Sequence, residues 1–416
     1  MPKRFLILTS DAGSGHRSAA QAIEAACKAT LGRRASVETC NAFQQPGAPS
    51  ELAWYEEFYK TWLQRLPILY HIGYALSELP PLAAMMRRDM RRRIGPLLRQ
   101  VVAERQPDVV ISVYPLLTDV VASVIEPERR PRLMSVVTDL GPVHRCWFTA
   151  ADDCCAVPTP LAFHKAVRCG LDERRVVATG LPVNPRFGRA PADLGALREK
   201  LGWERDLPAL LLLGGGAGVG QIAELADAID TAGLPLQMAV VAGNNEELSQ
   251  QLRGRDWHIP VHLYDFVKLP NLIHAADMIC TKAGGLTVSE SLAAGKPLLI
   301  HSVPPGQEAG NLQYVQALGA GCWTPDAPTL VAQVRRWMER PDELAEVGEA
   351  ARRLGHPEAA ERIARLAWEL VAGDEAEPAA PEEIDLQQHA YAQPDEMEVE
   401  VIRESEEQPR ALEAGA

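Results

Sequence analysis

Two segments of the chain begin the same pattern of strand, glycine-rich turn and helix, and this repeat limits the folds open to the chain. The first occupies Arg4–Leu31, with its turn at Ser10–Gly15, and the second occupies Ala209–Ala232, with its turn at Gly214–Gly220. Between and after them, short apolar runs alternate with helical stretches. Alternation of this kind is typical of parallel sheets that helices cover on both faces. The sequence therefore predicts an α/β protein with two doubly wound parallel-sheet domains.

The length agrees with this division. A chain of 416 residues holds about two domains, on the usual size of 100–200 residues for each. We place the boundary in the segment Leu181-Pro-Val-Asn-Pro-Arg-Phe-Gly188. The prediction is a Rossmann-like domain over residues 1–187 and a second one over residues 188–356, facing each other across a cleft.

The net charge of −13 comes almost entirely from the end of the chain. Residues 373–416 contain fourteen Asp and Glu against two Arg. This segment is rich in Pro, Glu and Ala, a composition typical of disorder. We therefore expect residues 373–416 to form an acidic disordered tail and the folded part to be nearly neutral, which leaves anionic substrates open to it.

Neither a membrane span nor a secretion signal is indicated. The longest apolar candidate, Val109–Ile125, contains Pro115 and Asp119, and the short run Phe5–Leu8 lacks a cleavage pattern. The eight cysteines form no Cys-x-x-Cys, so no zinc site or thioredoxin-like motif is predicted. We expect a cytoplasmic protein with no metal and no cofactor.

The stretch Thr281-Lys-Ala-Gly-Gly-Leu-Thr-Val-Ser-Glu290 carries the strongest chemical signal. A helix that starts after glycines offers free N–H groups and a positive dipole end to a phosphate. Glu290 lies one helical turn past Thr287, on the same face, where a carboxylate can accept two hydrogen bonds from a ribose diol. In the following loop, Gln307, Glu308 and Asn311 offer groups that bind sugar hydroxyls. Each piece alone is also common in α/β proteins without such a site.

These residues resemble the nucleotide-sugar site of the GT-B glycosyltransferases. The specific pieces are Lys282-Ala-Gly…Thr287-x-x-Glu290 and Pro305-Gly-Gln-Glu-x-Gly-x-x-Gln-Tyr-Val315. They are similar to those of monogalactosyldiacylglycerol synthases, bacterial diacylglycerol glucosyltransferases and the lipid II N-acetylglucosaminyltransferase. The resemblance covers roughly residues 4–370. It implies the GT-B fold, in which the helix within residues 357–372 crosses back onto the first domain. Ala217 departs from the pattern, because plant members carry Glu there.

The same resemblance indicates catalytic candidates in the first domain. The turn Asp11-Ala-Gly-Ser-Gly-His16 resembles the Gly-x-Gly-His turn that opens the galactolipid synthases. His16 at a helix N-terminus has its pKa lowered by the dipole, which favours the neutral form that a base needs; alternatively it is an exposed histidine. Val136-Val-Thr-Asp139 resembles a strand end of the acceptor domain. Asp139 is then the general base, an orienting partner of His16, or a cap of the next turn.

The remaining donor-site candidates come from glycine turns and from one apolar segment. The resemblance places the uracil base at Tyr264-Asp-Phe-Val267, although these residues also suit a core. A glycine turn before a helix suits a diphosphate or, alternatively, close packing of strand and helix; neither turn has P-loop or strict dinucleotide spacing. The remaining predicted UDP-sugar contacts are Gly13, Gly15, Gly215, Gly216, Phe266, Val267, Lys282, Gly284 and Gly285.

The function implied is that of an inverting glycosyltransferase, which moves a hexose from a UDP-sugar to a membrane lipid, with diacylglycerol as the expected acceptor. The chain has no Asp-x-Asp, so no metal clamp on the diphosphate is expected. Three alternatives remain: a transferase that uses UDP-N-acetylglucosamine, a UDP-sugar 2-epimerase of the same fold, and a UDP-sugar sensor without catalysis. No nucleic-acid partner is expected.

A lipid acceptor requires contact with a membrane, and residues 60–102 are aromatic and basic. Basic amphipathic stretches bind anionic membrane surfaces, although a solvated helix face gives the same pattern. We therefore predict peripheral association with the inner face of the cell membrane. The predicted basic face contains Arg87, Arg88, Arg91, Arg92 and Arg93, and the predicted inserting residues are Trp62, Leu66, Ile68, Leu69, Tyr70 and Tyr74.

Overall fold

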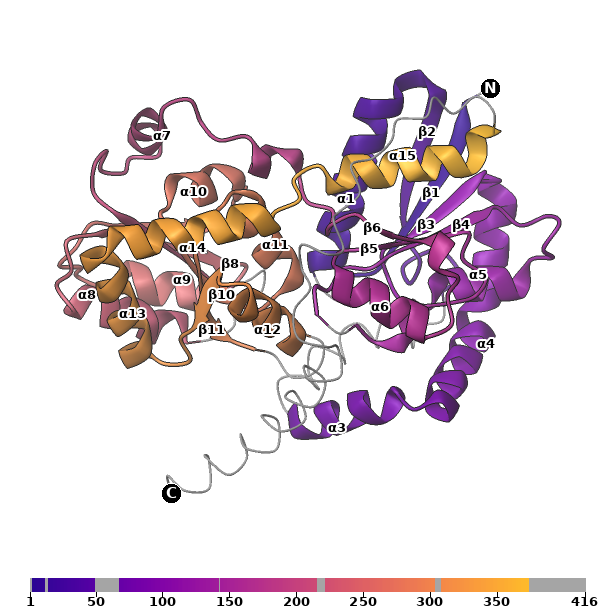
Figure 1. Cartoon of the computed structure of the whole chain (residues 1–416), viewed down its shortest axis with the longest axis horizontal. Coiled ribbons are helices and arrows are strands. Elements are labelled where there is room, and N and C mark those ends of the chain that lie inside the picture. The colour runs from indigo at the N-terminus through magenta and orange to yellow at the C-terminus, as the bar shows by residue number, and fades with distance from the viewer. Residues whose placement is uncertain are drawn as a thin grey trace.

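The computed structural model describes residues 2–11, 14–48, 67–141, 143–214, 221–303 and 308–373, which form two domains side by side (Figure 1). Each domain contains a six-stranded sheet, and all neighbouring strands pair in parallel. The predicted α/β protein with two doubly wound parallel sheets is thus confirmed. The predicted acidic tail lies outside the described residues from residue 374 onward.

The strands of the first sheet lie in the order β2-β1-β3-β4-β5-β6, and those of the second in the order β12-β11-β10-β7-β8-β9. Their bounds are β1 Lys3–Thr9, β2 Ala35–Asn41, β3 Val109–Ser112, β4 Arg132–Val136, β5 Cys154–Val157, β6 Val176–Ala178, β7 Ala209–Leu213, β8 Gln237–Gly243, β9 Val261–Asp265, β10 Met278–Lys282, β11 Leu298–Ser302 and β12 Gly321–Trp323.

The strand order reverses once in each sheet, between β1 and β3 in the first and between β7 and β10 in the second. In open α/β sheets, ligands bind in the crevice outside the carboxyl ends of strands at such a point. The predicted motifs follow β1, β7 and β10 directly. The topology therefore places the carboxyl ends of these three strands at the ligand-binding edge of each sheet.

Helices cover both faces of each sheet (Figure 1). They are α1 Ser14–Leu31, α3 Pro67–Ser77, α4 Pro80–Arg105, α5 Leu117–Val124, α6 Pro160–Arg168, α7 Leu194–Lys200, α8 Ile222–Thr231, α9 Glu246–Arg253, α10 Pro270–Ala275, α11 Gly285–Ala293, α12 Ala309–Ala317, α13 Ala327–Glu339, α14 Pro341–Leu354 and α15 Ala359–Ala372. Side chains of β1 alternate between the two faces: Phe5 and Ile7 pack against α1, and Leu6 and Leu8 against α4.

The last helix belongs to the core of the first domain. In α15, Ala360, Ile363, Ala364 and Ala367 are fully buried and pack with β1 and α1. Their spacing of three and four residues puts them on one face of the helix. Figure 1 shows that α15, which follows α14 of the second domain in the chain, lies alongside α1 of the first domain. The chain therefore crosses between the domains twice.

The two crossing segments lie against each other. Gly180 follows β6 with φ of 84°, and a Cβ there would lie 2.3 Å from the Cβ of His356. A Cβ on Gly188 would lie 2.3 Å from the Cβ of Pro357. Both glycines are needed because the second crossing passes too close for a side chain.

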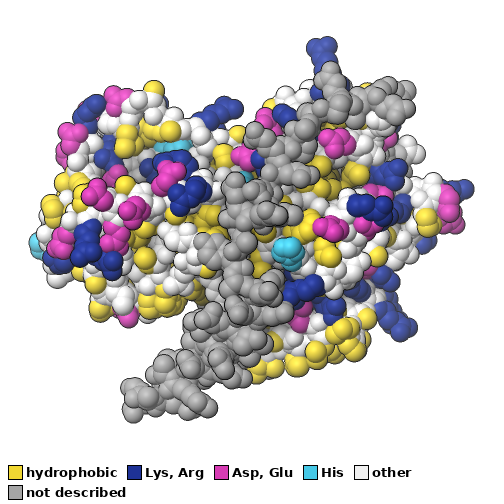
Figure 2. Space-filling model, in the orientation of Figure 1, with side chains coloured by type: hydrophobic (Ala, Val, Ile, Leu, Met, Phe, Trp, Pro, Cys, Tyr) yellow, Lys and Arg dark blue, Asp and Glu magenta, His cyan; other side chains and the backbone are white. Residues whose placement is uncertain are grey.

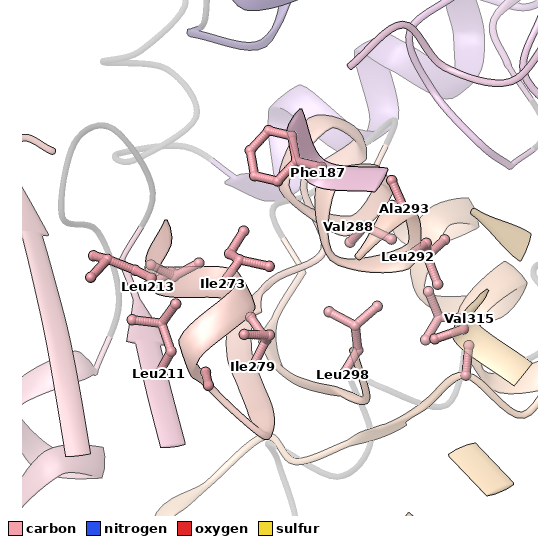
Figure 3. Packing of buried hydrophobic residues seen from close by; sticks show 14 of the residues in the cluster. Phe187, Leu211, Leu213, Ile273, Ile279, Val288, Leu292, Ala293, Leu298 and Val315 are labelled. Atoms are coloured by element: carbon pink, nitrogen blue, oxygen red, sulfur yellow. The ribbon is translucent and has the colours of Figure 1, made fainter. Parts of the chain in front are cut away.

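The first crossing is anchored in the second domain. Phe187, in the short helix Pro185–Gly188, is buried in the same cluster as Val288, Leu292 and Ala293 of α11. Figure 3 shows the Phe187 ring next to these three side chains. The linker thus fixes the position of α11, which begins at the predicted donor site.

Strand β2 lacks the apolar run by which the sequence indicates a strand. It pairs with β1 along its whole length, from Lys3↔Ala35 to Thr9↔Asn41. Most of its side chains are only partly buried, and it lies at the edge of the sheet. Because it contains polar residues such as Glu38 and Asn41, it does not read as the continuous apolar segment that is typical of a buried strand.

The predicted basic face of α4 needs a correction. The Arg91 guanidinium donates to both carboxylate oxygens of the buried Asp119 in α5, at 2.8 and 2.7 Å. Arg87 donates to the backbone carbonyls of Arg145 and Phe148 at 3.0 and 2.8 Å. A buried carboxylate needs charged partners, and Arg91, together with Arg87 at 3.5 Å, supplies them to Asp119. The two arginines thus hold α4 against the domain. Arg93 pairs with Asp89 on the surface, at 2.7 Å.

Candidate active site

The N-terminus of α11 lies at the carboxyl edge of the second sheet. Strand β10 ends at Lys282 with a register shift between Thr281 and Lys282, and Gly284 is the N-cap, with no side-chain hydrogen bond. The first N–H with a partner inside the helix is that of Val288, which donates to the carbonyl of Gly284 at 3.0 Å. The N–H groups at the start of the helix therefore lack partners within it and lie in the positive field of the helix dipole, which favours an anion.

Glu290 is buried one turn further along α11. The residue is 8 % exposed, and its Oε2 has no hydrogen-bond partner in the described structure. Desolvation raises the pKa of this carboxyl from 4.5 to about 8. A buried carboxyl without a partner is costly, and a ligand that donates two hydroxyl hydrogen bonds would remove this cost.

Lys282 and Glu308 form an ion pair next to this helix terminus. The Lys282 ammonium donates to both carboxylate oxygens of Glu308, at 2.5 and 2.8 Å. Both side chains are partly buried. The Lys282 Nζ also lies 3.1 Å from the position of a Cβ on Gly284, so its positive charge stands beside the open N-terminus of α11.

Asp139 reaches this place from the first domain. It is 7 % exposed, and its Oδ1 lies 3.5 Å from the position of a Cβ on Gly285. Desolvation and the charge of Glu308 raise the pKa of Asp139 to about 7, opposed by the Asn311 amide and by Lys282. Its carboxyl is thus poised to exchange a proton near neutral pH.

His16 lies in the first domain beside β3 and the segment after β4. Its Nδ1 is 3.2 Å from the hydroxyl of Thr138, and its ring packs edge-on against Tyr114 at 5.1 Å. Desolvation lowers its pKa to about 4, only partly opposed by the carbonyl of Val113. The imidazole is therefore neutral, as predicted for a base, but burial causes this. The Thr138 hydroxyl, which the sequence did not indicate, is thus a hydrogen-bond partner of this ring, and the orientation of His16 by Asp139 stays a prediction.

The other predicted contacts differ in accessibility. Phe266, directly after β9, is 69 % exposed, whereas Val267 packs partly against the core. Thr287 is half-buried. Asn311 is completely buried: its Oδ1 accepts from the Leu140 N–H at 2.7 Å, and its Nδ2 donates to the Ala283 carbonyl at 2.9 Å. The predicted contact of Asn311 with a sugar stays a prediction.

Comparison with known proteins identifies the family. The sequence model of monogalactosyldiacylglycerol (MGDG) synthase matches residues 16–183, and that of the glycosyltransferase family 28 C-terminal domain matches residues 209–363. The chain is 33% identical to monogalactosyldiacylglycerol synthase 2 of Arabidopsis thaliana over 377 residues, which cover 86% of this chain and 78% of that protein. The chain belongs to the monogalactosyldiacylglycerol synthase family of glycosyltransferases.

Solved structures agree on the fold of this family member. MurG from Acinetobacter baumannii superimposes with a TM-score of 0.55 at 15% identity, covering 88% of this chain and 100% of that one. A putative UDP-N-acetylglucosamine 2-epimerase from Listeria monocytogenes gives a TM-score of 0.60 at 13% identity, covering 92% and 99%. The predicted GT-B architecture is thereby confirmed.

Four predicted site residues of this synthase-family chain, Gly13, Gly215, Gly216 and Gln307, lie outside the described residues. Gly15 is described, and a Cβ on it would lie 3.9 Å from the Cβ of Leu286, so the first glycine turn approaches the start of α11. Within the described ranges, no cluster of three His, Cys, Asp or Glu side chains is arranged to hold a metal ion. No described helix is long and apolar enough to span a membrane.

The raised pKa of Glu290 predicts a pH dependence of stability. The folded protein keeps a proton on Glu290 up to about pH 8, whereas the unfolded chain releases it near pH 4.5. The free energy of unfolding therefore falls as the pH rises through this window. Glu290→Gln removes this titrating group. The unfolding free energy of the variant minus that of wild type, measured by urea unfolding, should therefore increase from about pH 5 to about pH 8.5.

The matched control is Glu339→Gln, which makes the same change at an exposed position. Its stability relative to wild type should stay constant over the same range. A Glu290→Gln difference that does not vary with pH would show that Glu290 is ionised in the folded protein.

Proposed function

We propose that this chain is an inverting glycosyltransferase that moves a hexose from a UDP-sugar to the hydroxyl of a membrane lipid, with diacylglycerol as the acceptor. The observation that carries this proposal is the buried carboxyl of Glu290, whose Oε2 has no hydrogen-bond partner among the described residues, one turn beyond the N-terminus of α11. Family membership supports the same reading.

In this proposal the second domain binds the donor. The ribose hydroxyls donate to Glu290, and the N–H groups at the start of α11, with Lys282, meet the phosphates. Uracil lies at the exposed Phe266 ring and the Val267 backbone. Glu308 accepts from the sugar hydroxyls. It is already held by Lys282, so it is oriented before the sugar arrives.

In the transfer step, the acceptor oxygen attacks the anomeric carbon while the bond from that carbon to the UDP oxygen breaks, which inverts the configuration. The hydroxyl proton passes to His16 or Asp139, the two candidate bases at the cleft. UDP leaves with the bonding electrons. The open N–H groups of α11 and the Lys282 ammonium stabilise its negative charge, since such preorganised donors act most strongly where charge develops.

Transfer is tested with radiolabelled UDP-galactose, UDP-glucose and UDP-N-acetylglucosamine, each incubated with the full chain and vesicles that contain diacylglycerol. Galactose is the first hexose to test, because relatives are named monogalactosyldiacylglycerol synthases. The expected result is a labelled glycolipid whose anomeric configuration is opposite to that of the donor. Acceptor-independent conversion of UDP-N-acetylglucosamine would instead indicate a 2-epimerase. Binding of a UDP-sugar without any turnover would indicate a sensor.

The base is assigned by two separate substitutions. His16→Ala should lower kcat by roughly 10²–10⁴-fold if His16 takes the proton, and UDP affinity should persist because His16 lies in the first domain. Asp139→Asn keeps the size of the side chain and removes its basicity, so a fall of the same size there would assign the role to Asp139. A His16→Ala enzyme with wild-type kcat excludes His16 as the base.

We further propose that α3 and the start of α4 bind the inner face of the cell membrane. Ile72, Leu76, Leu79 and Met85 are each about half exposed or more, at 49 %, 49 %, 51 % and 65 %. Figure 2 shows hydrophobic side chains along the lower edge of the first domain, where these helices lie in Figure 1. Clusters of exposed apolar side chains mark interaction surfaces.

Basic side chains accompany this apolar surface. Arg88 and Arg92 are exposed on α4, whereas Arg87 and Arg91 hold the helix to the domain. Of the predicted inserting residues, Trp62 and Leu66 lie outside the described residues, as do the side chains of Ile68, Leu69 and Tyr70; Tyr74 is half-buried and packs against His144 at 5.0 Å. The proposed surface therefore depends on Ile72, Leu76, Leu79 and Met85, flanked by two arginines.

Sedimentation with vesicles tests this surface. Replacing both Arg88 and Arg92 by Glu should weaken binding to anionic vesicles by about tenfold or more, because each basic residue contributes about 1 kcal/mol there, and high salt should have the same effect. Arg129→Glu is the control, since Arg129 is exposed and belongs to neither α3 nor α4 but to the segment after α5. Equal binding to neutral and anionic vesicles at every salt concentration would contradict the electrostatic part of the proposal.

A further inference from the structure

We propose that Asn311 and Gly141 form a latch that closes the two domains on each other and thereby positions Asp139 at the donor site. This inference rests on the proposed glycosyl transfer. It gives Asn311 a different role from the sugar contact that the sequence predicts. Both residues are positioning residues, which act on the reaction through Asp139.

The latch has a hydrogen bond across the domain interface. The N–H of Leu140, in the first domain, donates to Oδ1 of Asn311, in α12 of the second domain, at 2.7 Å. On its other side, the Asn311 Nδ2 donates to the carbonyl of Ala283 at 2.9 Å. The side chain has no exposed surface. Asn311 therefore connects the segment after β4 to the loop that precedes α11.

Close backbone contact accompanies this hydrogen bond. A Cβ added to Gly141 would lie 2.3 Å from Cα and 2.4 Å from the carbonyl carbon of Gly310. A Cβ added to Gly285 would lie 2.7 Å from the carbonyl oxygen of Thr138. Gly141 is not among the glycines with positive φ. The requirement for glycine at 141 therefore comes from the opposing domain and not from its own backbone.

Leu140 is held from both sides of the interface. Its side chain is 4 % exposed and packs in the hydrophobic core of the second domain. Its carbonyl accepts a hydrogen bond from the Thr159 hydroxyl of the first domain at 2.8 Å. The first domain thus presents a fixed backbone segment, and the second domain binds both its N–H and its side chain.

Asp139 directly precedes this held residue. With the latch closed, its Oδ1 lies 3.5 Å from a Cβ position on Gly285, at the N-terminus of α11. Opening the latch would withdraw Asp139 from the donor and leave Glu290 and the α11 N-terminus unchanged, because these belong to the second domain alone. Loss of the latch should therefore reduce turnover and spare UDP affinity.

Gly141→Ala is the most direct test, because it adds one methyl group to the first domain and changes no side chain near the donor. We expect kcat to fall by at least about tenfold at saturating substrates, with the UDP Kd from calorimetry within about twofold of wild type. Small-angle scattering with saturating UDP should give a larger radius of gyration for the variant than for wild type. Gly254→Ala is the control, since a Cβ there meets only ordinary contacts, at 3.5 Å or more.

Asn311→Ala gives a second, independent test from the other domain, and the double variant separates the two roles of Asn311. If both residues act through one latch, Gly141→Ala combined with Asn311→Ala should lose little more activity than the more impaired single variant. If Asn311 binds the sugar instead, the two losses multiply, and that result overturns the latch.

The latch and the proposed function can fail separately. Wild-type kcat in Gly141→Ala overturns the latch even when the wild-type enzyme transfers sugar. If the wild-type chain transfers no sugar, the scattering comparison still decides. A larger radius of gyration for Gly141→Ala with UDP supports the latch, and equal values overturn it.

Discussion

The burial of the Glu290 carboxyl, whose Oε2 has no hydrogen-bond partner among the described residues, is the constraint around which the second domain is arranged. Glu290 faces inward on α11, and burial holds its pKa near 8. Folding thereby places an acid where water cannot solvate it, which is unfavourable unless a ligand supplies hydrogen bonds. The helix that carries it begins with open N–H groups and is fixed by packing against Phe187 of the linker. The ribose and phosphate contacts of the proposed donor site therefore depend on the position of this one helix.

In the proposed reaction the first domain contributes the candidate bases, and the two crossings of the chain keep it next to the second. Because α15 packs in the core of the first domain, the second domain is covalently attached to it at both ends. Gly180 and Gly188 let the two crossings lie against His356 and Pro357. Such paired crossings restrict the relative motion of the domains. Gly141, against Gly310, and Gly285, against the Thr138 carbonyl, then allow the backbones of the two domains to approach closely enough for Asp139 to reach α11.

The sequence predicted features whose cause is local. Two starts of strand, turn and helix indicated two domains, and the spacing of Thr287 and Glu290 indicated a helix that carries a carboxylate at a phosphate-binding end. It did not predict interactions between distant segments. The hydroxyl of Thr138 beside His16 and the carboxylate of Asp119 beside Arg91 depend on how strands and helices stack. Strand β2 was missed because an edge strand needs no apolar run, and the interdomain bond of Asn311 joins residues 171 positions apart.

The most direct test of the donor site is the affinity for UDP alone, measured by calorimetry for wild type, Glu290→Ala and Glu308→Ala. If Glu290 binds the ribose, Glu290→Ala should weaken UDP binding by about tenfold or more, since it removes two hydrogen bonds that contribute about 0.5–1.5 kcal/mol each. Glu308→Ala should bind UDP within about twofold of wild type, because Glu308 is expected to contact only the sugar. Equal UDP affinity in wild type and Glu290→Ala would contradict the assignment of this site.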